Sequence, residues 1–178
     1  CSGIEKMIDP HQNEVELLSE LIFALEMSQG DFRLFLGSCN YQIQRRRLME
    51  KLQTSFYGDL AILEVDASVE KLYTTIGQHL GEQQPDAFMV WGLELNRNID
   101  KLLVSMGLVR EEFKNNYQFP ILLWIDQEIS RKFIRLIPDF ESWTSLTVFE
   151  TTTQELKDFI HQTSESVIQK ILESGEGI

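Results

Sequence analysis

Short apolar runs alternate with amphipathic segments along this 178-residue chain. The apolar runs are strand-sized and end at small or polar residues, so they predict β-strands. Residues 86–94 and 119–125 form nearly continuous apolar runs, which is typical of strands that helices cover on both faces. The predicted strands begin at residue 31, ahead of a small-residue corner at 37–40, and continue with 60–65, 86–94, 119–125 and 145–149.

Between the strands, apolar residues recur at helical spacing. We expect Asn13 to cap the first helix and either Asp66 or Ser68 to cap the third, because these residue types accept hydrogen bonds from the first helical amides. The second helix is predicted at 41–56, with Ile43 among its buried residues.

The second half of the chain continues the same alternation. One long helix is predicted from about residue 95 to 113, with a kink at Gly107, and Asp126 caps the next helix. Thr152 and Glu155 have capping-box spacing before a last helix. The apolar residues of that last helix are Leu156, Phe159, Ile160, Val167, Ile168 and Ile171.

Strands and helices therefore alternate five times, which indicates an α/β fold. We expect a three-layer α/β/α sandwich around a five-stranded, mainly parallel sheet. Residues 1–13 read as a linker, 14–174 as a single domain and 175–178 as a tail.

The corner after the first strand compares with the phosphate-binding loop of P-loop proteins. That loop reads G-x-x-x-x-G-K-[ST], and its backbone amides and lysine hold the phosphates. Residues 37–44 read GSCNYQIQ, so the second glycine, the lysine and the final hydroxyl residue are missing. The strand-to-helix corner is therefore predicted without the residues that normally bind phosphate there. A P-loop order places the first strand between the fourth and fifth, whereas a flavodoxin-like order places it beside the second and third, and the sequence leaves both open.

Composition limits the classes of partner. The formal net charge is -12 and the pI about 4.7, which argues against a nucleic-acid surface because phosphate binding needs a basic face. No apolar run is long enough to span a membrane. The cysteines, Cys1 and Cys39, give neither a disulfide framework nor a metal-ligand pair, so we expect a reducing, cytoplasmic setting with Cys39 as a small core residue. A processed lipoprotein terminus at Cys1 is the alternative.

Ligands of open α/β sheets gather at the carboxyl ends of the strands. There the sequence offers Gly37, Ser38 and Asn40 at the corner, Glu94 after the third strand and Asp126 after the fourth. A nucleotide would use these residues. The structural alternatives, which we favour, are a first-turn acid for Glu94 and a helix cap for Asp126.

Arg45, Arg46 and Arg47 lie in the first turns of the helix after the corner. Arg45 or Arg46 could replace the missing lysine on a phosphate, but three consecutive residues point in different directions around a helix. A solvated basic face, or a docking patch for an acidic partner, is the reading we favour. The three histidines lack metal-ligand spacing, so no metal site is expected, and no residue is an evident catalytic nucleophile.

Several segments together resemble a known family. The corner at 32–40, the strands at 85–94 and 119–125, and PDFESW at 138–143 followed by VFE at 148–150 resemble a degenerate P-loop NTPase domain of bacterial, especially cyanobacterial, multidomain proteins. Those proteins continue into tetratricopeptide repeats, and their wider relatives are the STAND and NB-ARC signalling ATPases. The resemblance implies a module in sensing or defence signalling, with neighbouring effector and repeat domains as its partners.

Three functional hypotheses follow. The first is a non-hydrolysing, P-loop-like module for protein interaction and assembly, since the degenerate Walker motif lacks its lysine and its acidic pair. The alternative is a regulatory switch that binds ATP or ADP without efficient hydrolysis, through the amides of 37–40 and Arg45 or Arg46. An enzyme of unrelated chemistry on a flavodoxin-like sheet is a third reading, which only the carboxylates at the strand ends support.

Overall fold

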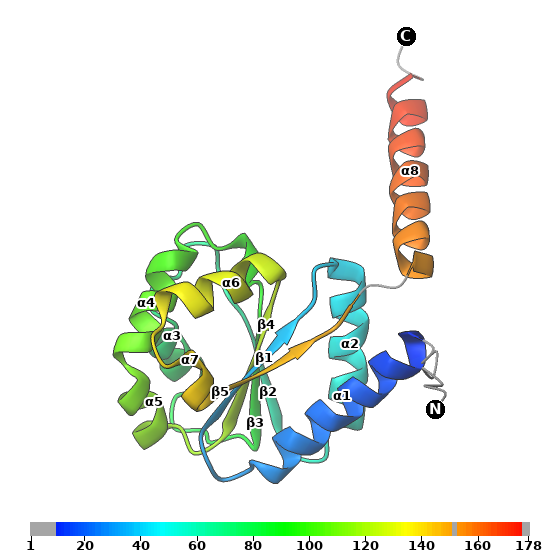
Figure 1. Ribbon diagram of the computed structural model, residues 1–178. Helices are drawn as coiled ribbons and strands as arrows, with labels where there is room; N and C mark the ends of the chain where they lie inside the picture. The colour runs from blue at the N-terminus through cyan, green and yellow to red at the C-terminus, as the bar shows by residue number, and fades with distance from the viewer. Residues whose placement is uncertain (1–9, 151–152, 176–178) are drawn as a thin grey trace, which may run out of the picture.

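The five strands form one parallel sheet with the order β2-β3-β4-β1-β5. We describe the fold from a computed structural model, in which residues 10–150 and 153–175 are described. The predicted three-layer α/β/α architecture and parallel sheet are confirmed (Figure 1). The strands are β1 (Arg33–Ser38), β2 (Leu60–Glu64), β3 (Ala87–Trp91), β4 (Pro120–Ile125) and β5 (Thr144–Val148).

β1 lies between β4 and β5. It pairs with β4 from Arg33 opposite Pro120 to Ser38 opposite Ile125, and its other side pairs with β5. This is the P-loop order, so the flavodoxin-like alternative is wrong. β2 and β5 are the two edges of the sheet.

Helices cover the two faces of the sheet unequally. Two helices pack on one face and four on the other, each through its own apolar cluster. On the first face lie α1 (Pro10–Met27) and α2 (Gln42–Ser55). On the second lie α3 (Leu72–Leu80), α4 (Ile99–Leu108), α5 (Arg110–Asn116) and α6 (Gln127–Leu136), and the remaining elements are the 3₁₀ turn η1 (Leu93–Leu95), α7 (Phe140–Trp143) and α8 (Thr153–Gly175).

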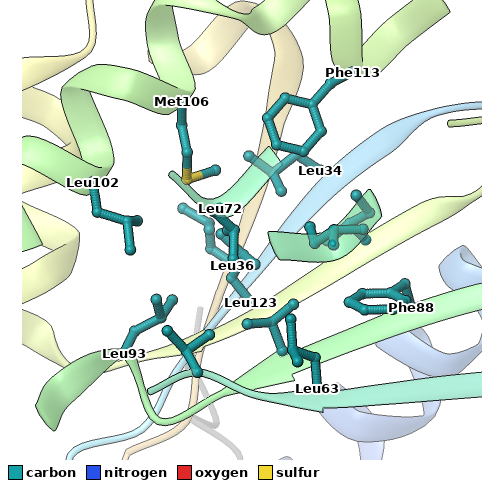
Figure 2. Packing of buried hydrophobic residues seen from close by; sticks show 14 of the residues in the cluster. Leu34, Leu36, Leu63, Leu72, Phe88, Leu93, Leu102, Met106, Phe113 and Leu123 are labelled. Carbon is teal, nitrogen blue, oxygen red and sulfur yellow. The ribbon is translucent and has the colours of Figure 1, made fainter. Parts of the chain in front are cut away.

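The core of the second face is built from branched and aromatic side chains. Leu34 and Leu36 of β1 and Leu123 of β4 point toward Leu102 and Met106 of α4 (Figure 2). These side chains are at most 1% exposed. Alternate residues of the same strands serve the other face, where Phe35 and Trp124 pack toward α1 and α2. This alternation explains the unbroken apolar runs in the sequence.

Helix boundaries differ from the sequence-based predictions at several points. α1 begins at Pro10, so Asn13 lies inside the helix and does not cap it. α3 begins only at Leu72 and has no side-chain cap. Asp66 instead accepts hydrogen bonds from the backbone amide and the hydroxyl of Ser68, which lower the pKa of its carboxyl group.

The predicted helix over 95–113 is interrupted, and the predicted kink at Gly107 is wrong. Gly92 adopts a left-handed conformation with φ 90°, after which η1 turns the chain before α4 begins. α4 and α5 are separated at Val109, whose φ of -108° and ψ of 25° leave the helical region. Ile43 is a further difference, because it is 50% exposed rather than buried.

The last helix stands apart from the layers. α8 follows β5 and projects away from the sheet (Figure 1). Thr152 of the predicted capping box lies outside the described residues. In the part of the chain that the structure describes, no helix is long and apolar enough to cross a bilayer.

Candidate functional site

The corner between β1 and α2 is tighter than a phosphate-binding loop. β1 continues to Ser38 and α2 begins at Gln42, so only residues 39–41 join them. Gly37 lies within β1, opposite Trp124 of β4 and Thr147 of β5. A Cβ at Gly37 would come within 2.9 Å of the Trp124 ring, so packing alone explains this glycine. The hydrogen bonding between β1 and β4 continues one residue into the corner, where the Cys39 amide donates to the Ile125 carbonyl at 2.9 Å.

An ion pair between a buried arginine and a partly buried glutamate lies at this corner. Arg45 is 3% exposed, and its Nη1 lies 2.7 Å from Oε1 of Glu94 in η1. Its Nη2 donates to the Cys39 carbonyl oxygen at 2.5 Å. Since β4 separates β1 from β3 in the sheet, the Arg45–Glu94 pair bridges the segments that follow β1 and β3, two strands that are not neighbours. The predicted solvated basic face is therefore wrong for Arg45, although Arg46 is exposed.

A second buried network joins α1 to α2 beside this pair. Glu14 is 6% exposed and accepts two hydrogen bonds from Arg47 Nη2, at 2.7 and 2.9 Å. Gln44 Nε2 donates to Glu14 at 3.0 Å and to the Glu150 carbonyl at 3.1 Å. The Cys39 thiol lies 3.2 Å from Gln44 Oε1. Cys39 is fully buried, as predicted.

The other candidate residues lie at the same edge of the sheet with structural partners. Asp126 Oδ1 accepts from the Ile129 amide at 2.8 Å, which confirms the predicted helix cap. Asn40 Oδ1 accepts from the Gln127 amide at 2.8 Å and so ties the corner to the start of α6. Ser38 is buried.

A cavity of about 430 Å³ opens beside the corner, between β5 and α6. Ser38, Asn40 and Tyr41 line it from the corner, Arg131 from α6 and Val148 from β5. It contains two of the predicted site residues, whereas Arg45, Arg46, Glu94 and Asp126 do not line it. The candidates thus share an edge of the sheet, but only Arg45 and Glu94 are joined by a described contact between their side chains.

Sequence reasoning missed Glu14 and Gln44 as members of the site. Gln44 and Arg47 lie three residues apart on α2, a spacing that places them on one helix face, and this was the available signal. Nothing in the sequence near Glu14 indicates that it reaches the same place. Among the described residues, no group of three or more histidine, cysteine, aspartate or glutamate side chains could hold a metal ion.

Solved structures give the comparison that decides the fold. A Drosophila ORC structure, bound to poly(dA/dT) DNA and Cdc6, matches 83% of this chain with a TM-score of 0.52 and 12% sequence identity. This chain has a P-loop NTPase-like fold. The match agrees with the strand order β2-β3-β4-β1-β5, which is the P-loop order. Our chain spans only 30% of the matched ORC chain.

Two further structures match with lower scores. The ADP form of the Aeropyrum pernix ORC2 protein covers 90% of this chain, which spans 55% of that one, with 16% identity and a TM-score of 0.48. The Thermotoga maritima RuvB Holliday junction branch migration motor covers 92% of this chain, which spans 53% of that one, with 18% identity and a TM-score of 0.42. No protein-family model and no curated protein matches the sequence.

Proposed function

We propose that this protein is a non-hydrolysing, P-loop-like module for protein interaction and assembly. The observation that carries the proposal is the ion pair of the buried Arg45 with Glu94 at the corner. In a working phosphate site, a cation and free backbone amides face the anion. Here the buried cation is already neutralised by Glu94 and hydrogen-bonded to the corner itself.

The residue at the lysine position supports the same proposal. If residues 37–44 are aligned with G-x-x-x-x-G-K-[ST], Ile43 stands in place of the lysine and is half exposed. An aliphatic side chain supplies no charge to a β- or γ-phosphate. Glu94, the one carboxylate at the end of β3, is engaged by Arg45 and so is poorly placed to hold magnesium or to activate water.

The surface offers apolar side chains for protein contacts. Val104 and Leu108 of α4 lie one helical turn apart and are exposed, as are Phe23 and Met27 of α1. Exposed apolar groups that lie close together are typical of interaction surfaces. The resemblance to multidomain signalling and defence proteins of bacteria suggests effector and repeat domains as the partners.

The experiment that tests this proposal measures magnesium-dependent ATP turnover by the purified chain. We expect no turnover above the buffer background. Turnover that is lost in Glu94→Gln but retained in Glu128→Gln would overturn the proposal. Glu128 is a matched control because it is an exposed glutamate in the first turn of another helix, α6.

The cavity beside the corner favours a second candidate function, the nucleotide-binding switch. Ser38 and Asn40 both line this cavity, so a nucleotide could lie there without reaching Ile43. A thermal-shift titration with ATP and ADP tests this alternative. It predicts a saturable stabilisation that weakens in Arg131→Ala, because Arg131 lines the cavity, and that persists in Lys51→Ala, an exposed cation on α2. No shift at millimolar nucleotide would exclude it.

A further inference from the structure

The projecting helix α8 carries an uncovered apolar stripe. Ile160, Val167, Ile168 and Leu172 are 49% to 66% exposed. Their spacing of seven, eight and twelve residues places them along one side of a helix. Twenty-three helical residues extend about 35 Å. A stripe of this length on a helix is normally buried against another surface.

A second uncovered apolar surface lies on β5 and α6. Leu146 and Val148 are 39% and 50% exposed, and they pair in register with Leu36 and Ser38 of β1. They therefore point to the same face of the sheet as Leu36, the face on which α6 packs. We call Leu146, Val148 and the neighbouring Ile134 of α6 the β5–α6 surface.

Ile134 extends this surface along α6. Ser130 and Arg131 of α6 line the 430 Å³ cavity together with Val148. Ile134 lies one turn further along the same side of the helix and is 63% exposed. α6 returns antiparallel to the strands, so this turn lies further toward the start of β5, the direction in which Leu146 precedes Val148.

The charges of α8 and α6 are complementary. α8 carries four acidic and two basic residues, whereas α6 carries three basic and one acidic. Lys132 of α6 is already paired with Asp100 of α4, but Arg131 and Arg135 are exposed on its outer side. An acidic helix with an apolar stripe fits beside them.

The chain's own α8 is directed away from this surface. After β5, the Phe149 amide donates to the Ser38 carbonyl at 2.8 Å, and the Phe149 ring packs in the cluster under α1 and α2. The Glu150 carbonyl then accepts from Gln44 of α2. The end of β5 is thus held to α2 and to the apolar cluster on the face of the sheet opposite α6.

We propose that α8 packs on the β5–α6 surface of a second copy of this chain. If each copy of a dimer contributes its α8 to the other, the same contact forms twice and the assembly closes. This inference gives a partner to the assembly function proposed above. The two can fail separately, because ATP turnover would refute the proposed function without affecting a dimer, and a monomer could still bind other proteins.

The test compares the mass of the chain in solution, by size-exclusion chromatography with light scattering, with that of two variants. We expect a dimer for the unmodified chain. Leu146→Glu places a like charge against α8, and Val167→Lys places one against α6, so each should weaken the dimer by about tenfold or more. Val15→Lys on α1 is the control, an exposed valine outside both surfaces that should leave the dimer unchanged. Circular dichroism of each variant checks that it has folded.

Mixing the two variants gives the decisive result. A Leu146→Glu copy keeps an intact α8, and a Val167→Lys copy keeps an intact β5–α6 surface, so the mixture regains one of the two contacts. We expect more dimer in the mixture than in either variant alone. A monomeric unmodified chain would overturn the proposal. So would a dimer that resists Leu146→Glu but not Val167→Lys, because that pattern indicates pairing of α8 with α8.

Discussion

At the scale of single residues, the corner between β1 and α2 shows that the role of a side chain depends on the residue it contacts. Three consecutive arginines suggest a solvated basic face, and Arg46 fits that description. Arg45 is instead buried against Glu94, and Arg47 binds Glu14 across thirty-three residues of sequence. Such long-range pairs leave no local pattern, which is why the sequence supplied the candidates but not their contacts.

The Arg45–Glu94 pair makes a testable contribution to stability. Arg45→Met leaves the Glu94 carboxylate without its cation, and we expect the free energy of unfolding to fall by about 3 kcal/mol. The double variant Arg45→Met/Glu94→Leu should recover most of this loss, because it removes both charges. Urea denaturation measures both changes. Arg46→Met is the matched control, and an equal loss there would contradict the assignment.

Tyr117 gives a pH-dependent prediction at the same scale. Burial raises the pKa of its phenol to about 12, and its hydroxyl donates to the Tyr73 carbonyl at 2.8 Å. Above pH about 10 the unfolded chain loses this proton while the folded chain keeps it, so the phenol's contribution to stability falls as the pH rises from about 10 to 12. The midpoint temperature of thermal unfolding should fall less over this pH range for Tyr117→Phe than for the unmodified chain. Parallel declines would show that Tyr117 is not responsible.

At the scale of elements, the strands were easier to predict than the helix ends. All five predicted strands are present, and their bounds shift by at most a few residues, because a buried parallel strand reads as an apolar run with polar ends. The break between α4 and α5 is at Val109, which is neither glycine nor proline. The apolar pattern continues across this residue and therefore predicted a single helix. The amphipathic pattern predicted α8 but could not show where its apolar stripe would lie.

The cap of α6 is a prediction that belongs to this scale. Asp126 accepts from the Ile129 amide, so Asp126→Ala should destabilise the protein by about 1 kcal/mol. Asp126→Asn keeps an acceptor oxygen and should retain most of the stability. Chemical denaturation of the three proteins checks the order. Equal stability of the alanine and unmodified proteins would mean that another group satisfies the first turn of α6.

At the scale of the whole molecule, alternation of elements predicted the fold class, and the structure settled the strand order that the sequence left open. The Drosophila ORC structure that matches this chain is bound to DNA, but this chain carries a net charge of -12. We therefore expect no retention of a DNA duplex in a mobility-shift assay at physiological salt. A shift that weakens steeply with added salt would contradict this expectation and point to Arg131 and Arg135 as phosphate contacts.

The way the polypeptide leaves β5 also has a mechanical consequence. β5 is an edge strand that pairs with β1 in the sheet, and α8 is the next element along the chain. A pull on α8 along the strand axis would load the β1–β5 hydrogen bonds together, in shear, whereas a sideways pull would open them one at a time. Before that load reaches β5, the Glu150 carbonyl transmits part of it through Gln44 to α2. A force on α8 would thus act first on α2, at the corner where Arg45 is buried.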